Sequence, residues 1–286
     1  MKMNQLLQEL EQEQCSDLEK IEIDLLLEGI YRHYGFDFRN YAFSSIRRRI
    51  WHRLKAEKIE SVTALLDRIL HDSSMMEKLY LDFSINVTEM FRDPSFFKVV
   101  RYKILSQLSE LPSIRIWHAG CSTGEEAYSM AILLHEMNLY HKVKIYATDM
   151  NNRVIQQAKL GQFPLKKMKD YTSNYVNSDG KNDFSEYYTV KGETAIFQKE
   201  LSKNIIFAQH NLVTDGSFNE FHMIVCRNVL IYFDRELQAR VHELFINSLS
   251  EKGFLALGNR EGLSFSKKDK YYHVFDEDEK IFRRVQ

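Results

Sequence analysis

A glycine loop followed by two glutamates is the first stretch of this sequence whose residues could bind a ligand. The apolar run from Ile116 to Ala119 leads into Gly120-Cys121-Ser122-Thr123-Gly124, and Glu125 and Glu126 then begin a helical pattern. A strand, a glycine turn and a helix N-terminus favour negative charge, because unpaired N–H groups and the helix dipole point at the loop. Two carboxylates already occupy this first turn, so they would repel a pyrophosphate.

The next apolar run ends at a carboxylate that suits a ribose. Residues 142–148 have the pattern of a strand, and Asp149 follows, 29 residues after Gly120. A carboxylate at this place can accept hydrogen bonds from a ribose diol. The dinucleotide pattern GxGxxG is absent, so the loop indicates a nucleoside with positive charge and no phosphate.

S-adenosylmethionine meets each of these requirements, because it carries adenine, a free ribose diol, a sulfonium and an ammonium group. In this interpretation Glu126 or Glu125 binds the cationic methionine end and Asp149 binds the ribose. Spacing alone leaves an alternative open, in which the two glutamates only cap the helix and complement its dipole.

Polar residues also follow two later strand-like runs. Asn211 and Leu212 come after IIFAQH, where an adenine could be sandwiched and hydrogen-bonded, and Arg227, Asn228 and Tyr232 come after HMIVC. Because carboxyl ends of parallel strands share one edge of a sheet, we expect these side chains to converge on one cleft.

The elements that position these residues fall into two parts. Residues 1–85 show helical periodicity and are expected to form an all-α domain, with 1–18 as a polar leader. Residues 86–112 are expected to be a connector that contributes to the active site rather than to the core. Residues 113–286 alternate strand-like and helical runs, which predicts an α/β, Rossmann-like sheet. An antiparallel hairpin is expected at the C-terminal end and a small inserted β-subdomain near 183–197.

Composition excludes several classes of protein. A formal net charge of -1 provides no overall field for nucleic acid or a membrane, and neither a signal peptide nor an apolar run of membrane-spanning length is present. Three dispersed cysteines and unpaired histidines argue against disulfides and a metal site. We therefore expect a cytoplasmic monomer that binds no metal and no nucleic acid.

A basic segment at residues 44–58 stands out from this balanced charge, since it contains six Lys and Arg residues and one acid. On a helix, Ile46, Ile50 and Leu54 form the buried stripe, and the cations lie opposite it or on its flank. Such a run is most often a solvated face, and nucleic acid is the usual second interpretation. The cations in question are Arg48, Arg49, Arg53 and Lys55.

Five motifs in this order, NVTEMFRD, AGCSTGEEAYS, ATDMN, HNL and CRNVLIYFD, resemble the CheR chemotaxis-receptor methyltransferases over roughly residues 20–285. The resemblance implies an S-adenosylmethionine-dependent enzyme that esterifies glutamates on the cytoplasmic helices of chemoreceptors. It implies that the basic helix recognises the acidic receptor surface, and that Arg92 and Tyr232 act at the accepting glutamate. The cofactor positions are Asn86, Thr88, Arg92, Gly120, Glu126, Asp149, Asn211, Leu212, Arg227 and Asn228.

The implied reaction needs no general base, since a glutamate carboxylate has a reference pKa near 4.3 and is ionised at neutral pH. Two alternatives remain open at this stage. One is a methyltransferase of the same fold that acts on another substrate, such as a nucleic acid, although no proline-rich loop of the base amino-methylases is present. The other is a cofactor-binding regulatory module without turnover.

Overall fold

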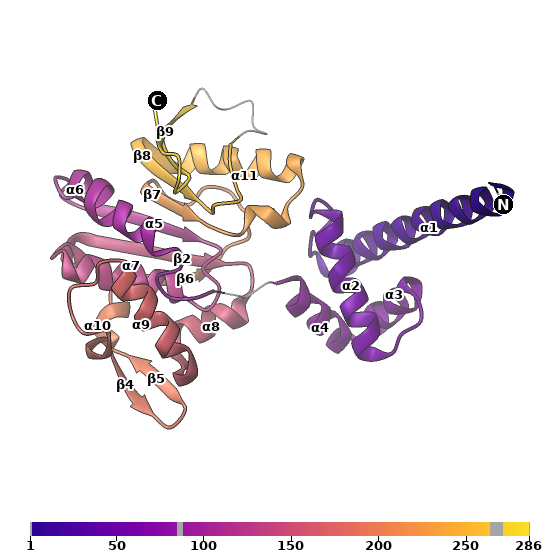
Figure 1. The fold of residues 1–286 in the computed structure, drawn as a ribbon, viewed down its shortest axis with the longest axis horizontal. Helices are drawn as coiled ribbons and strands as arrows, with labels where there is room; N and C mark the ends of the chain where they lie inside the picture. Colours follow the sequence, from indigo (N-terminus) through magenta and orange to yellow (C-terminus); the bar gives the residue numbers. More distant parts are fainter. Residues whose placement is uncertain (1, 85–87, 264–270, 286) are drawn as a thin grey trace. The chain divides into compact units, whose positions relative to one another are not determined.

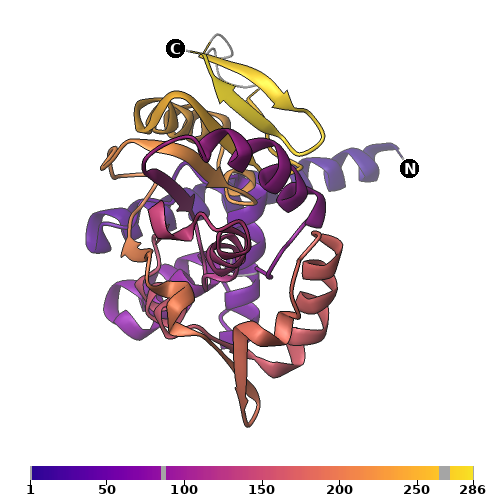
Figure 2. The ribbon, with the colours of Figure 1, turned by 90° about the vertical axis from the view of Figure 1, so that its left-hand side faces the viewer.

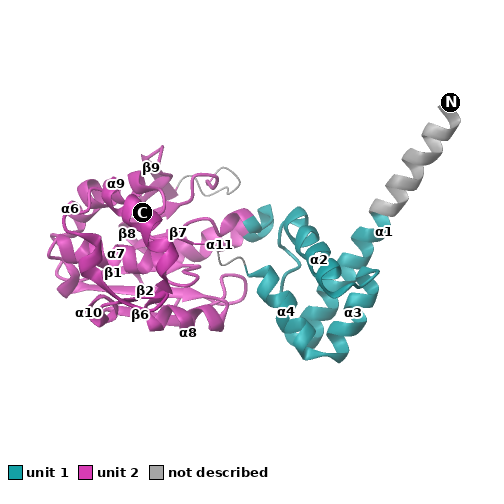
Figure 3. Cartoon of the chain, turned by 60° about the horizontal axis from the view of Figure 1, so that its bottom comes forward, with its two compact units in different colours: residues 1–85, 232–237 teal, residues 86–231, 238–286 magenta. Residues whose placement is uncertain are grey.

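The computed structural model describes residues 2–84, 88–263 and 271–285, with side chains described from residue 17 onward. The chain forms two compact units, residues 1–85 with 232–237 and residues 86–231 with 238–286 (Figure 3). Each unit is described by itself below.

The first unit is all-α, as its periodicity predicts. Its helices are α1 (Lys2–Tyr34), α2 (Phe43–Glu57), α3 (Val62–His71) and α4 (Ser73–Phe83). Ser61 and Asp72 cap α3 and α4 by accepting hydrogen bonds from Ala64 N and Ser74 N, at 3.1 and 2.9 Å. The expected polar leader is not a separate element, because α1 runs through it without a break.

A short segment from the second half of the sequence belongs to this first unit. Tyr232 O accepts a hydrogen bond from Ala42 N (2.9 Å), and Asp234 N donates to Asn40 O (2.9 Å). Sequence reasoning assigned residues 232–237 to the α/β part, because periodicity cannot reveal backbone bonds that join residues almost 200 positions apart.

The second unit is built on a seven-stranded sheet in the order β6-β2-β1-β7-β8-β10-β9 (Figure 1). Strands β6, β2, β1, β7 and β8 are parallel, and β10 is antiparallel to both β8 and β9, which confirms the predicted C-terminal hairpin. The strand order changes direction between β1 and β7, which is where doubly wound sheets bind ligands. The bounds are β1 Ile114–Ala119, β2 Val143–Asp149, β6 Ile205–Gln209, β7 Phe221–Cys226, β8 Leu249–Leu257, β9 Tyr272–Asp276 and β10 Ile281–Arg284.

Helices pack on both faces of this sheet (Figures 1 and 2). Neighbouring residues of β1 point to opposite faces: Ile116 belongs to the main core cluster, and Trp117 packs against Phe245 with ring centroids 5.7 Å apart. The longer helices are α7 Glu125–Glu136, α8 Asn152–Leu160, α9 Met168–Asn177 and α11 Arg235–Ser248. Short ones are α5 Pro94–Val99, α6 Leu105–Leu108, α10 Lys199–Ser202, the π-helical turn Val100–Ile104, and 3-10 turns at Tyr140–Lys142, Leu165–Lys167, Phe184–Tyr187 and Leu230–Tyr232.

The expected connector is part of the core, so that interpretation was wrong for most of its length. Residues 94–108 are helical, and Phe91, Phe96 and Phe97 are fully buried. Phe91 packs against Phe97 and Tyr175, with ring centroids 4.9 and 5.2 Å apart. The prediction relied on the polar residues of the segment and gave too little weight to its aromatic residues, which favour burial.

The inserted β-subdomain is present as a small antiparallel sheet in the order β3-β5-β4. Strands β4 (Tyr188–Lys191) and β5 (Thr194–Phe197) form the predicted hairpin. The third strand, β3 (Gln162–Pro164), was not predicted, because three residues are too few to show a strand period.

Candidate cofactor and acceptor sites

The loop after β1 is a tight turn that requires its glycines. Gly120, Ser122 and Gly124 have φ values of 80°, 52° and 93°, in the left-handed region. A Cβ atom on Gly120 would lie 2.5 Å from the Val229 side chain. The Ser122 hydroxyl is buried and has no hydrogen-bond partner among the described residues, so the loop presents an unsatisfied polar group as well as a close backbone approach.

Asp149 closes this loop from the end of β2. Its two carboxylate oxygens accept hydrogen bonds from Ser122 N and Asn151 N, both at 2.9 Å. Burial raises the pKa of Asp149, and backbone hydrogen bonds oppose this rise only in part. The side chain is half-buried, and an ionised carboxylate offers about four lone-pair sites. Asp149 therefore keeps acceptor capacity for the hydroxyls of a ligand.

The two glutamates that begin α7 point into different surroundings. Glu125 is 2% exposed and accepts hydrogen bonds from Tyr171 Oη (3.2 Å) and Thr123 Oγ1 (2.5 Å), and burial raises its pKa. It is an interior group whose two carboxylate oxygens accept hydrogen bonds from protein hydroxyls. Glu126 is bound by His118 Nδ1 (3.0 Å) and Arg227 Nη1 (2.9 Å). Burial raises the pKa of Glu126, but these two partners outweigh burial and hold it below the usual range.

Arg227 ties the segment before α5 to the end of β7. Its side chain is 1% exposed, and Nη2 donates to Asp93 Oδ2 (2.5 Å) while Nη1 donates to the Arg92 carbonyl (3.2 Å) as well as to Glu126. The guanidinium also lies 4.2 Å from the centre of the Phe96 ring. Thus both Nη atoms of Arg227 are engaged by protein groups, whereas its buried Nε has no hydrogen-bond partner among the described residues. The predicted contact of Arg227 with the cofactor stays a prediction.

Sequence reasoning missed two members of this cluster, Asp93 and His118. Asp93 adopts φ 55° directly before Pro94, and a signal existed in the aspartate that stands just before a helix start. His118 is a polar residue on an otherwise apolar strand, 1% exposed, with a buried Nε2 that has no partner in the described part of the chain. A buried histidine on a core strand needs a partner, and that requirement could have pointed to Glu126.

Of the remaining predicted cofactor residues, those that follow β6 and β7 lie at the carboxyl edge of the sheet. Asn211 follows β6 and accepts a hydrogen bond from Val213 N (3.0 Å), and Leu212 beside it is half-buried. Asn228 follows β7 with φ 61°. Thr88 precedes α5 and is half-buried, whereas Asn86 lies outside the described residues.

In the first unit, half of the predicted cationic residues of α2 are engaged within the protein. Arg49 is 8% exposed and donates to Ser45 O (2.7 Å), burial lowers its pKa, and its guanidinium lies 5.3 Å from the centre of the Tyr232 ring. Arg53 pairs with Asp82 (2.7 Å) and Glu57 (3.1 Å). Arg48 and Lys55 are exposed. Two of the four predicted substrate residues are therefore held in internal contacts.

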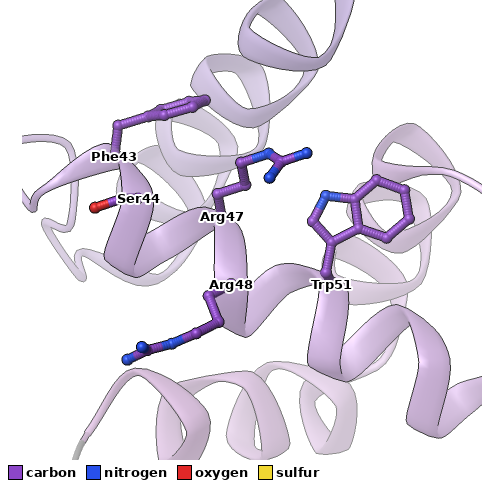
Figure 4. Close-up of a pocket in the computed structure, with 5 residues that line it drawn as sticks. All are labelled: Phe43, Ser44, Arg47, Arg48 and Trp51. Atoms are coloured by element: carbon purple, nitrogen blue, oxygen red, sulfur yellow. The ribbon is translucent and has the colours of Figure 1, made fainter. Parts of the chain in front are cut away.

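An open hollow of about 410 Å³ lies along α2 (Figure 4). Its lining combines aromatic and cationic side chains, and Phe43 and Trp51 are 41% and 48% exposed. Arg47, beside them, pairs with Glu19 of α1 at 2.7 Å. Exposed aromatic and arginine side chains together are typical of protein-binding surfaces. The lining residues are Phe43, Ser44, Arg47, Arg48 and Trp51.

Neither a metal-binding cluster nor a membrane-spanning helix is found in the described part of the protein. Over the described residues, no three His, Cys, Asp or Glu side chains are grouped so that they could hold a metal ion. Within the ranges that the structure covers, no helix combines the length and apolar character needed to cross a bilayer.

Comparison with known proteins gives matches over both units. The family model "CheR methyltransferase, SAM binding domain" matches residues 86–280, and "CheR methyltransferase, all-alpha domain" matches residues 21–84. Cher3 of Pseudomonas putida is 46% identical over 92% of this chain and 97% of its own length. The chemotaxis protein methyltransferases of Listeria innocua and Salmonella typhimurium are 29% and 26% identical, over 81% and 82% of this chain and 86% and 81% of their own.

Proposed function

Because the chain belongs to the CheR methyltransferase family, we propose that it transfers the methyl group of S-adenosylmethionine to glutamate side chains on the cytoplasmic helices of chemoreceptors, forming methyl esters. The cofactor follows from the matched SAM binding domain. The observation that carries the proposal is the half-buried Asp149 carboxylate, with acceptor capacity left over, beside a loop that also holds an unsatisfied Ser122 hydroxyl.

Different residues at the carboxyl edge of the sheet can bind different parts of the cofactor. Asp149 accepts the ribose hydroxyls, and Asn211 with Leu212 lies at the end of β6, where the adenine is expected. Glu126 remains the candidate for the ammonium group, because His118 and Arg227 hold it in the ionised form that a cation needs. Glu125 is left out of this assignment, since its carboxylate is directed at Tyr171.

Bound S-adenosylmethionine supplies an electrophilic methyl group on a sulfonium. The accepting glutamate is ionised at neutral pH, so the protein has to orient it and exclude water rather than remove a proton. Holding the two reactants in line can supply roughly 7–11 kcal/mol of the barrier reduction. The Arg92 guanidinium can grip a carboxylate by its fork, and the Tyr232 hydroxyl can donate a hydrogen bond to one oxygen.

The receptor is recognised, in this proposal, by the exposed part of α2. Arg48 and Lys55 supply positive charge toward an acidic receptor helix, and Phe43 and Trp51 supply apolar area on either side of Arg47 (Figure 4). Arg49 and Arg53 contribute by shaping the unit, since their guanidinium groups are held by Ser45 and Asp82.

A methyl-transfer assay with cytoplasmic receptor fragments tests the proposal. We expect label from methyl-labelled S-adenosylmethionine to enter the fragments as esters that mild base releases. Arg92→Ala and Tyr232→Phe should reduce turnover by about tenfold or more, because a lost charged hydrogen bond in the transition state is worth about 1.5–3 kcal/mol. Both variants should retain more of their affinity for S-adenosylhomocysteine than of their turnover.

Controls in the same assay separate the acceptor surface from the chemistry. Arg48→Glu should raise KM for the fragment while the affinity for S-adenosylhomocysteine stays unchanged, and Arg68→Glu, an exposed arginine of α3, should change neither. Base-stable label, or label on RNA or DNA, would show that another acceptor is used. Tight binding of S-adenosylhomocysteine without any transfer would favour a regulatory module.

A further inference from the structure

A buried carboxylate that sequence reasoning did not single out holds the loop after β7. Glu261, four residues past the end of β8, is 8% exposed. Its Oε2 accepts hydrogen bonds from Gly258 N (2.6 Å) and Asn228 N (3.0 Å), and its Oε1 accepts one from Ile231 N (3.2 Å). One side chain therefore satisfies backbone donors from two separate loops.

The backbone N–H groups that Glu261 binds in the β7 loop lie at the start of a 3-10 turn. They have no acceptor within that turn. Leu230–Tyr232 is a 3-10 turn, and the first N–H groups of such a turn point away from it without internal acceptors. Asn228, just before the turn, adopts φ 61°, a left-handed conformation that costs a residue with a side chain roughly 1–2 kcal/mol. The contacts with Glu261 stabilise this conformation.

Gly258 allows the loop after β8 to approach the loop after β7. A Cβ atom there would lie 2.8 Å from Asn228 N and 2.8 Å from Glu261 Oε2, distances that real Cβ atoms do not show. Gly258 has no unusual φ to explain it, so its role is to let the two loops approach. The absence of a side chain at residue 258 thus allows the Glu261 carboxylate to reach both backbones.

We propose that Glu261 is a positioning residue for the cofactor cleft: it fixes the backbone of residues 228–231 and thereby aims the Asn228 side chain. The inference rests on the proposed function, together with the expectation from the family resemblance that Asn228 is one of the cofactor residues. Glu261 does not contact the cofactor itself in this scheme, because its oxygens are taken by backbone N–H groups and it is almost entirely buried.

Glu261→Gln tests the proposal, because it keeps the size of the side chain but turns an NH₂ group toward backbone donors. We expect the amides of Asn228 and Ile231 to exchange about tenfold faster, since one lost charged hydrogen bond corresponds to about that factor. The affinity for S-adenosylhomocysteine should fall by about five- to tenfold. KM for S-adenosylmethionine should rise while KM for the acceptor is unchanged, a split that a general loss of folded protein would not produce.

Gly258→Ala should reproduce this pattern by pushing the loops apart, so the proposal can still be tested if one variant folds poorly. Glu251→Gln, an exposed glutamate of β8, is the matched control and should leave both readouts within about twofold. Unchanged amide exchange and unchanged affinity in Glu261→Gln would overturn the proposal. Amide exchange and the affinity for S-adenosylhomocysteine involve no acceptor, so these two readouts test the proposal separately from receptor methylation.

Discussion

The loops after β1 and β7 flank the point where strand order reverses, and each is closed by a carboxylate from the neighbouring parallel strand. Asp149 at the end of β2 binds Ser122 N of the first loop, and Glu261 after β8 binds Asn228 N of the second. Burial raises the pKa of both carboxyls. The two loops also meet directly, because Gly120 approaches the Val229 side chain.

The two carboxylates differ in exposure and in the number of backbone hydrogen bonds that they accept. Asp149 is half-buried and accepts a backbone hydrogen bond on each oxygen, from Ser122 and Asn151, whereas Glu261 is 8% exposed and accepts backbone hydrogen bonds from three residues. We therefore expect Asp149 both to fix its loop and to bind a ligand, and Glu261 only to fix its loop.

Arg227→Met should cause the largest loss in the free energy of unfolding, because it removes the buried cation at the first residue of the loop after β7. Removing one partner of a buried charge cluster costs about 3–5 kcal/mol, because Asp93 and Glu126 lose their shared cation. Urea unfolding at pH 7 measures the loss. The pKa of Glu126 is lowered in the folded protein, so its stabilising contribution is present above the ordinary glutamate pKa of 4.5 and is lost at lower pH.

The difference between Arg227→Met and the unsubstituted protein should therefore shrink as the pH falls through and below 4.5. Arg115→Met is the matched control, because Arg115 of β1 forms a partly exposed pair with Glu220 at 3.4 Å and should contribute about 0–1 kcal/mol. Equal losses in the two variants would mean that the buried cluster has no special energetic weight.

Gly120→Ala tests the first loop and its contact with the second. The left-handed backbone costs about 1–2 kcal/mol and the clash with Val229 about 1–3 kcal/mol more, so we expect a loss of about 2–5 kcal/mol in unfolding free energy. Gly192→Ala, with φ 57° and nothing within 4 Å of the added Cβ, isolates the backbone part. If Gly120→Ala combined with Val229→Ala recovers nothing, the two loops are not coupled at this point.

Local patterns in the sequence were sufficient for much of this arrangement. The alternation after residue 112 predicted the parallel sheet, the stripe Ile46, Ile50 and Leu54 is buried as expected, and Asp149 was found from its place after a strand. These features depend on residues within one element or at its end.

The features that were missed depend on partners distant in the sequence. Glu261 lies 33 residues from Asn228, and Asp93 lies 134 residues from Arg227. Helical spacing predicted that Arg53 is a surface cation, but in the structure it pairs with Asp82. Helical spacing gives the direction of a side chain but not its partner. The sequence therefore showed where these charged residues are but not which groups they contact.

Asp149→Asn tests whether the accessible carboxylate binds the cofactor. A neutral amide keeps the side chain's size but weakens hydrogen bonds from ribose hydroxyls, which should cost about 1.5–3 kcal/mol in the affinity for S-adenosylhomocysteine at pH 7.5. Because burial raises the pKa of Asp149 above the ordinary aspartate value of 3.8, the unsubstituted protein should begin to lose affinity at a pH higher than that value as the solution is acidified. The asparagine variant should not show this dependence.

Calorimetric titrations from about pH 7.5 to 5, with circular dichroism to verify folding, measure both effects. Asp170→Asn, an exposed aspartate of α9, should behave like the unsubstituted protein. Glu261→Gln should be weaker at every pH but should keep the acid dependence, because its Asp149 is intact. If Glu261→Gln instead removes the acid dependence, the titrating group lies in the second loop and the division between binding and shaping carboxylates is wrong.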